Sequence, residues 1–324
     1  MILLRTLRVL AAAVAVAGSV GMVSAQEFPS RPLKLIMGFG PGGLADIAGR
    51  SIGQVLTQSM GQPVVIENLP GAGGTPAALA LARSAPDGHT FLWASSQNAI
   101  APSMFKSLPY DWSGDFATVG PMSVFDFVLF VHQDSPLKTV KDVIDAAKAN
   151  PDKFNFGSIA VGTAQNLSTL NFVSMAGLKV PTVPFRATGE VVTALASANV
   201  QAAFETIPGV IGQINSGALR AIAVSSDKRV PFLPDVPTIA ESGVPGYRTY
   251  SWNGIVVPAK TPRDIILRLN KEINAAIATP EIQKRFRELI MEPRTGTPDD
   301  LQRIYEGDVA VWRKIIADAN IQPN

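Results

Sequence analysis

The sequence contains no cysteine and only two histidines. Without cysteine the chain has neither a disulfide nor a cysteine-linked lipid anchor, so its stability depends on burial of a core. His89 and His132 lack the spacing that zinc ligands show, and we expect no metal site. Neither a G-x-S-x-G nucleophile turn nor a phosphate-loop lysine is present. With these constellations missing, we expect no enzyme and no cofactor.

An excess of charge of either sign is also missing. The formal net charge is +2, from 28 Lys and Arg against 26 Asp and Glu. Removal of residues 1–25 takes away Arg5 and Arg8, which leaves 26 basic residues against 26 acidic ones. A neutral chain lacks the basic surface of a nucleic-acid binder, so we expect no nucleic-acid partner. No segment after residue 25 is long and apolar enough to span a membrane.

The first 25 residues have the pattern of a secretory signal peptide. Arg5 and Arg8 precede an apolar stretch over residues 9–20, and small residues lead to a cleavage site near Ala25. The alternative is an N-terminal membrane anchor, for which the apolar stretch is short. An exported chain without disulfides fits the bacterial periplasm, so we expect a periplasmic protein.

From Pro32 onward strands alternate with helices, which is typical of an α/β protein. At 324 residues the chain is long enough for two domains. The apolar strand over residues 125–131 and a strand from Tyr250 to Val257 are candidates for two crossings between them. This predicts a discontinuous lobe 1, residues 26–126 and 250–324, and a lobe 2, residues 127–249.

A glycine-rich turn, GFGPGG at residues 38–43, lies between the strand over residues 33–37 and a helix that begins at Leu44. Backbone N–H groups and the positive end of the helix dipole make such a turn suitable for a small anion. The same letters satisfy the dinucleotide fingerprint, with Glu67 after the second strand, and so allow an NAD-dependent oxidoreductase. Export to a compartment poor in NAD argues against that alternative. A turn that needs glycine only for its geometry is a third interpretation.

Polar residues follow several other strands, where ligands gather in α/β proteins. Asp46 lies in the first turn of the helix and either interacts with the helix dipole or faces a ligand. Gly162-Thr163 repeats the glycine-to-helix device in lobe 2, so we expect a second anion cradle facing the first. Arg186 has the chemistry to pair with a carboxylate. The other candidates at strand ends are Ser95, Asn98, Ser158, Thr163, Gln165, Asn166 and Glu205.

Several segments, taken in order, resemble the Bug family, the extracytoplasmic solute-binding receptors of tripartite tricarboxylate transporters. They are GFGPGGLADIAGR, GQPVVIENLPGAGG, APDGHTFLWAS, FGSIAVGTAQNL, LPDVPTIAESGVPGY, SWNGIVVPAKTP and EPRTGTPDDL. The resemblance implies a two-lobed periplasmic-binding-protein fold, type II-like, with two crossing strands. It also implies a cleft in which backbone amides hold a small organic acid, delivered to a membrane permease.

The resemblance assigns ligand contacts to two groups of residues. They are Phe39, Gly40, Pro41, Gly42 and Gly43 with Asp46 in lobe 1, and 158–166 with Arg186 and Ala187 in lobe 2. Asn166 stands where the family often has His, Ala187 where it has Gly, and residues 194–198 also depart from its pattern. We therefore expect a monomeric solute-binding protein whose lobe 2 contacts differ from the family's. A sensor that signals to a membrane kinase remains an alternative.

Overall fold

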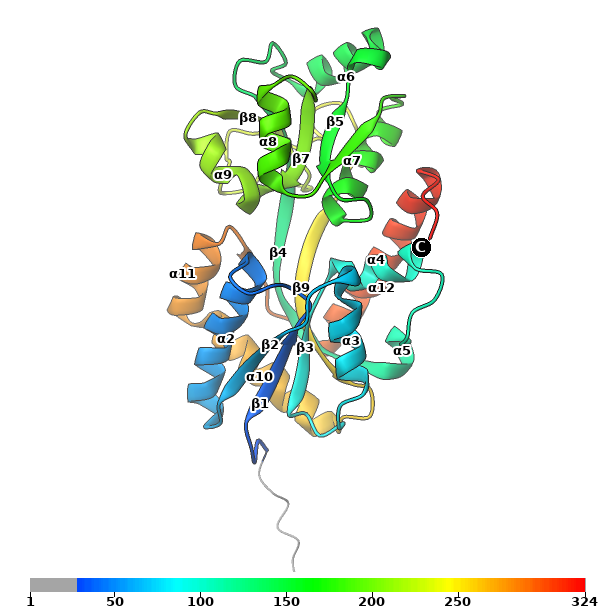
Figure 1. Ribbon diagram of the computed structural model, residues 1–324. Coiled ribbons are helices and arrows are strands. Elements are labelled where there is room, and N and C mark those ends of the chain that lie inside the picture. The colour runs from blue at the N-terminus through cyan, green and yellow to red at the C-terminus, as the bar shows by residue number, and fades with distance from the viewer. Residues whose placement is uncertain (1–27, 324) are drawn as a thin grey trace, which may run out of the picture.

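A computed structural model describes residues 28–323, except the side chain of Ala72. The expected signal peptide, residues 1–25, lies outside this range. Figure 1 shows two lobes joined by the long strands β4 (Phe116–His132) and β9 (Tyr250–Pro258). In the described part of the chain, no helix combines the length and apolar character that a membrane span needs.

Lobe 1 is built on a sheet in the order β2-β1-β3-β9-β4, with β10 also paired to β4. Its helices cover both faces of this sheet (Figure 1). The remaining elements are β1 (Leu33–Met37), α2 (Leu44–Met60), β2 (Val64–Asn68), η1 (Ala72–Gly74), α3 (Thr75–Ala82), β3 (Thr90–Ser95), α4 (Ser96–Met104), α5 (Trp112–Asp115), α10 (Arg263–Ala278), α11 (Pro280–Glu288), β10 (Glu292–Pro293) and α12 (Pro298–Asp318).

Lobe 2 is built around the second half of β4, which pairs with β7 on one side and β8 on the other. Strands β5 and β6 continue the sheet beyond β7. Its other elements are α6 (Val140–Ala149), η2 (Pro151–Lys153), β5 (Phe156–Ile159), α7 (Ala164–Met175), β6 (Thr182–Phe185), α8 (Thr188–Ala196), β7 (Ala202–Thr206), α9 (Ile207–Asn215) and β8 (Leu219–Val224).

The change of lobe along β4 occurs between two adjacent residues. Asp126 pairs with Tyr250 of β9 in lobe 1, whereas Phe127 pairs with Thr206 of β7 in lobe 2. The Ser225 hydroxyl accepts from the Phe127 N–H at 2.8 Å and donates to the Thr249 carbonyl at 2.6 Å. One buried side chain therefore ties the two crossings together.

Strand β4 begins at Phe116, not at residue 125 as the sequence pattern predicts. Gly120 and Pro121 resemble turn residues in the sequence. In the structure the register with β9 shifts between Thr118 and Gly120 and again between Pro121 and Ser123. These irregularities accommodate the glycine and the proline within one 17-residue strand.

The strand order excludes the dinucleotide-binding interpretation of the glycine-rich turn. In that fold β3 lies beyond β2, and all the strands around the turn are parallel. Here β3 lies on the opposite side of β1 from β2, and its next neighbour β9 is antiparallel. Glu67, the acidic residue after the second strand in that interpretation, forms an ion pair with Lys34 at 2.8 Å.

A continuous apolar core extends through both lobes along β4 and β9. It includes Leu92 of lobe 1, Phe172 of lobe 2 and Trp252 of β9. Helix α12 covers the junction and contributes Trp312 and a buried carboxylate, Asp308. The oxygen Oδ2 of Asp308 accepts from the indole nitrogens of Trp252 at 2.6 Å and Trp312 at 3.1 Å. The C-terminal helix thereby attaches to the strand that returns to lobe 1.

Candidate functional site

The interlobe pocket lies between the glycine-rich turn of lobe 1 and helix α7 of lobe 2, with a volume of about 440 Å³. Not one of its lining residues carries a formal charge. It is lined by Phe39, Gly40, Pro41, Gly43, Leu44, Ala45, Ser95, Ser96, Gln97, Phe125, Phe127, Ala164, Gln165, Thr206, Ser251, Asn253 and Met291. Hydrogen-bond donors in this pocket therefore come from the backbone and from neutral polar side chains.

The N-termini of four helices, α2, α4, α7 and α9, reach this pocket. Each begins directly after a strand or a short loop at the carboxyl end of a strand, the edge where ligands bind in α/β sheets. Each N-terminus carries a partial positive charge from its helix dipole. Their convergence gives a pocket without charged side chains a positive electrostatic potential.

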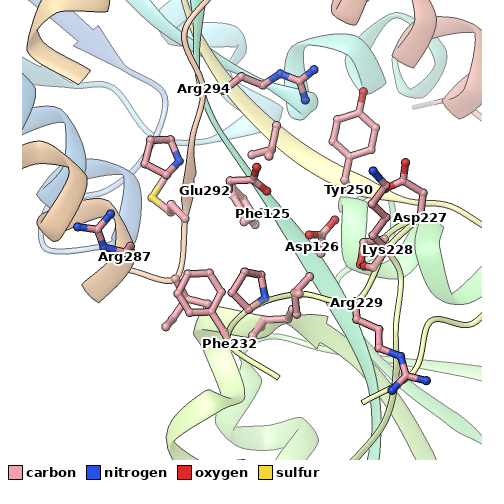
Figure 2. Close-up of a pocket in the computed structure, with 18 of the residues that line it drawn as sticks. Phe125, Asp126, Asp227, Lys228, Arg229, Phe232, Tyr250, Arg287, Glu292 and Arg294 are labelled. Carbon is pink, nitrogen blue, oxygen red and sulfur yellow. The ribbon is translucent and has the colours of Figure 1, made fainter. Parts of the chain in front are cut away.

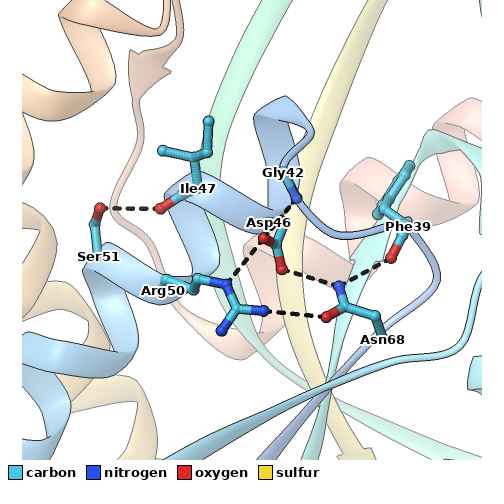
Figure 3. Close-up of polar contacts among 7 residues, drawn as sticks. All are labelled: Phe39, Gly42, Asp46, Ile47, Arg50, Ser51 and Asn68. Atoms are coloured by element: carbon cyan, nitrogen blue, oxygen red, sulfur yellow. Dashed lines mark hydrogen bonds and ion pairs between the residues drawn. The ribbon is translucent and has the colours of Figure 1, made fainter.

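Within the glycine-rich turn, Asp46 holds the backbone in place (Figure 3). Its Oδ2 accepts from the Gly42 N–H and from Arg50 Nε, each at 2.9 Å, and its Oδ1 accepts from Asn68 Nδ2 at 2.9 Å. Asn68 Nδ2 also donates to the Phe39 carbonyl at 3.0 Å. The Arg50 hydrogen bond is the main reason that the pKa of Asp46 falls to about 2.

Asp46 is 3% exposed and does not line the pocket. The structure therefore argues against the ligand-facing interpretation of Asp46. Its carboxylate instead holds the backbone of the turn through the Gly42 N–H. Gly42 also lies outside the lining, and its φ of +80° allows its N–H to turn back toward Asp46. Phe39, Gly40, Pro41 and Gly43 do line the pocket.

Helix α2 begins at the pocket without a side-chain cap. Its N-cap is Gly43, and in the described chain the backbone N–H groups of Gly43, Leu44 and Ala45 donate to no protein acceptor. First-turn N–H groups need an acceptor from outside the helix. These groups are therefore free to bind a carboxylate at the pocket.

The other three helices at the pocket are capped by their own side chains. Ser95 and Asn98 form a capping box at α4, and Thr206 accepts from the Gly209 N–H at α9. Ser95 lines the pocket, but Asn98 is 4% exposed and lies outside the lining, where its Oδ1 accepts from the Ser95 N–H. These caps leave other first-turn donors unpaired, such as the Ala164 and Gln165 N–H groups of α7, so α2 differs in having no side-chain cap at all.

The expectation of a second cradle at the start of α7 stays a prediction, but the side chains expected there bond to one another. Thr163 caps α7 by accepting from the Asn166 N–H, and Asn166 Oδ1 accepts from the Gly162 N–H at 3.2 Å. Asn166 Nδ2 donates to the buried Ser158 hydroxyl at 2.9 Å. Ser158, Thr163 and Asn166 thus satisfy one another and lie outside the pocket lining. The next two residues, Ala164 and Gln165, do line the pocket, and in the described chain their backbone N–H groups donate to no protein acceptor.

Gln165 is the polar residue of α7 that reaches the pocket. Its Nε2 donates to Glu205 Oε1 at 3.0 Å. Glu205 is 1% exposed, and it also accepts from the Thr188 hydroxyl at 2.9 Å and from the Thr206 N–H at 2.6 Å. A buried carboxylate therefore lies directly behind the lobe 2 wall of the pocket.

Arg186 and Ala187 are exposed and do not line the pocket. The Arg186 N–H donates to Glu190 Oε2 at 3.0 Å. The structure therefore does not bring the expected guanidinium clamp to the interlobe pocket.

The two lobes touch between Gly162 and Met104. A Cβ on Gly162 would lie 2.5 Å from Met104 Cε of lobe 1.

Sequence reasoning missed the pocket residues that come from the crossing strands. Phe125 and Phe127 flank the change of lobe on β4, and Asn253 lies on β9. Asn253 is held by two hydrogen bonds, from Trp93 Nε1 at 2.8 Å and to the Ser123 hydroxyl at 3.0 Å. A polar residue within the otherwise apolar run of β9 was the available signal.

A second, larger cavity, the hinge pocket, has a volume of about 610 Å³ and shares Phe125 and Met291 with the interlobe pocket. Figure 2 shows the carboxylates of Asp126 and Glu292 near its middle, with the guanidinium groups of Arg287 and Arg229 at its edges. Its lining holds five basic residues, Lys228, Arg229, Arg248, Arg287 and Arg294, against three acidic ones, Asp126, Asp227 and Glu292. The interlobe pocket differs from it in having helix N-termini in place of charged side chains.

Asp126 makes the stability of the protein depend on pH. Burial, and then the negative charges of Glu292 and Asp227, outweigh the positive charge of Arg248 and raise its pKa to about 7. A raised carboxyl pKa stabilises the folded state most at low pH, and this contribution is lost as the pH rises from about 4 to 7.

We therefore expect Asp126→Asn to raise the free energy of unfolding by about 1–2 kcal/mol at pH 8 and to change it little at pH 4.5. Urea unfolding followed by tryptophan fluorescence at both pH values measures the difference. Asp134→Asn, at a side chain that is 91% exposed, is the control. An equal effect of Asp126→Asn at the two pH values would contradict the prediction.

Comparison with known proteins places this geometry in a family. The family described as tripartite tricarboxylate transporter family receptor matches residues 48–321. BugT of Bordetella pertussis is 33% identical over 316 residues, which cover 97% of each chain. The solved periplasmic binding protein BugD is 30% identical with a TM-score of 0.77, covering 92% of this chain and all of that one. R. palustris Rpa4515, solved with adipate, is 32% identical with a TM-score of 0.80 and the same coverage.

These matches agree with the two-lobed α/β fold and with a binding pocket that has no catalytic residues. They also exclude the alternative of an NAD-dependent oxidoreductase, since the family consists of receptors. The chain belongs to the receptor family of the tripartite tricarboxylate transporters and is a solute-binding protein.

Proposed function

We propose that the protein captures a small organic acid in the interlobe pocket and delivers it to the membrane permease of a tripartite tricarboxylate transporter. One observation carries the proposal: four helix N-termini converge on a pocket without charged side chains, and α2 offers unpaired N–H groups there. The adipate of the related Rpa4515 is an acid of this class.

The protein would act as a monomer in the periplasm, after removal of residues 1–25. We place lobe 1 at residues 26–126 and 250–324 and lobe 2 at residues 127–249, because the pairing partner of β4 changes at Asp126 and Phe127. Closure would then be a hinge motion about two short crossings. The closed, loaded form is the one that docks on the permease.

A thermal-shift screen of residues 26–324 tests the binding step. Mono- and dicarboxylic acids, aliphatic and aromatic, are compared with NAD⁺ and NADH. A ligand at about 100 times its Kd contributes about 2.7 kcal/mol and should raise Tm by roughly 4–8 °C. Stabilisation by none of the acids would overturn the proposal. Uptake of the best acid by cells with and without the receptor gene tests delivery.

A further inference from the structure

The interlobe pocket has two chemically different ends. At the lobe 1 end the first turn of α2 supplies unpaired N–H donors. At the lobe 2 end the polar wall is Gln165, with the carboxylate of Glu205 directly behind it. The first turn of α7 also brings unpaired N–H groups to the lobe 2 end, so the two ends differ in the Gln165 side chain and in the buried carboxylate behind it.

The Glu205 carboxylate sets which amide atom of Gln165 is left without a hydrogen bond. A carboxylate only accepts hydrogen bonds, so the Gln165 group bonded to it must be the Nε2 amide donor. The other amide atom, Oε1, accepts no hydrogen bond from the residues at 28–323. The Gln165 side chain thus keeps an acceptor, while its amide donor is bonded to Glu205.

Nothing in the described chain neutralises Glu205 by an ion pair. Its three partners are the neutral groups of Gln165, Thr188 and the Thr206 backbone. The lining adds no Lys or Arg that would balance it. A second carboxylate on the ligand beside Gln165 would be repelled by this charge.

We propose that the physiological acid carries a single carboxylate and, toward lobe 2, a hydroxyl or ammonium group that donates to Gln165 Oε1. This inference rests on the proposed function. Glu205 is the positioning residue that fixes this preference. The remaining walls, formed by Phe39, Leu44, Phe125, Phe127 and Met291, accommodate an apolar carbon chain between the two polar groups. The ligand class is therefore a small hydroxy or amino monocarboxylic acid.

Calorimetry on residues 26–324 with acids of matched length tests the proposal. The four-carbon series is butyrate, 3- and 4-hydroxybutyrate, 4-aminobutyrate and succinate, and the six-carbon series is hexanoate, 6-hydroxyhexanoate, 6-aminohexanoate and adipate. In the preferred series, the best hydroxy or amino acid should bind at least about 10-fold more tightly than both the simple monocarboxylate and the dicarboxylate. The hydroxy and amino members distinguish a neutral donor from an ammonium group.

Two variants assign the preference to residues. Glu205→Gln should strengthen dicarboxylate binding by about 10- to 100-fold and reduce the advantage of the hydroxy or amino acid. Gln165→Leu should lower that advantage to the level of the simple acid. Asp126→Asn removes a carboxylate from the hinge pocket instead, and its ligand preference should match the wild type. The melting temperature of each variant reports folding.

Dicarboxylates that bind the wild type as tightly as the hydroxy and amino acids would overturn this inference and leave the proposed function intact. An unchanged preference in a folded Glu205→Gln variant would do the same. If no acid of either class binds, the proposed function fails, and this inference fails with it.

Discussion

Leu44→Pro should weaken binding of the acid by about 10- to 100-fold, because it deletes one N–H donor from the uncapped first turn of α2. Leu44 is the first residue of the helix, where proline is well tolerated. The preceding Gly43 has φ −78° and ψ 172°, an extended conformation that proline also allows in its neighbour. The helix should therefore form, and calorimetry with the best acid measures the loss.

Leu44→Ala is the matched control for this substitution. It removes the same apolar side chain from the pocket wall but keeps the N–H group. Its affinity should lie much closer to the wild type than that of Leu44→Pro. If the two variants lose affinity equally, the side chain and not the backbone donor holds the ligand, and the α2 cradle is refuted.

Asp308→Ala should lower the free energy of unfolding by about 3 kcal/mol, the largest stability loss that we expect from one polar residue here. The substitution leaves two buried indole N–H groups, on Trp252 and Trp312, without their acceptor. It also opens a void between α12 and β9. Urea unfolding at pH 7 measures the loss, and the fluorescence of the two tryptophans should change in the folded protein.

Asp308→Asn separates the acceptor from its charge. Burial raises the pKa of Asp308 to about 6, so its ionised form costs free energy in the folded state at neutral pH. Asparagine keeps an oxygen acceptor for the indoles without that cost, and the loss should stay below about 1 kcal/mol. A loss from Asp308→Asn as large as from Asp308→Ala would show that the charge itself is required.

The residues changed in these two predictions, Leu44 and Asp308, both lie in lobe 1. The α2 cradle lies in lobe 1, and the Asp308 cluster ties α12 to the base of β9, which carries the pocket residue Asn253. Ligand contacts in lobe 1 thus rest on a rigid, buried support. In the proposed closure, lobe 2 would move against lobe 1 about the short crossings at residues 126–127 and 249–250.

Much of the fold could be predicted from the sequence because it depends on local patterns. The glycine-rich turn between β1 and α2 follows from residue types within a few positions of one another. The alternation of strands and helices, and the ordered segments shared with a receptor family, gave the α/β class and the two lobes. The start of β4 was mispredicted, because a proline and a glycine that normally end a strand lie here at irregularities of its register with β9.

The sequence by itself determined that the chain is an α/β solute receptor, and it predicts a backbone anion cradle after β1. Only the tertiary structure decided which polar residues remain available to a ligand. Two neighbours on α7 differ in this respect. The side chain of Asn166 is hydrogen-bonded to Ser158 and Gly162. Gln165 keeps an unbonded side-chain oxygen, because its amide nitrogen donates to Glu205, 40 positions away. Each polar side chain can form only a few hydrogen bonds, and folding decides which neighbours take them. The spacing of residues along the chain does not show which neighbours those are.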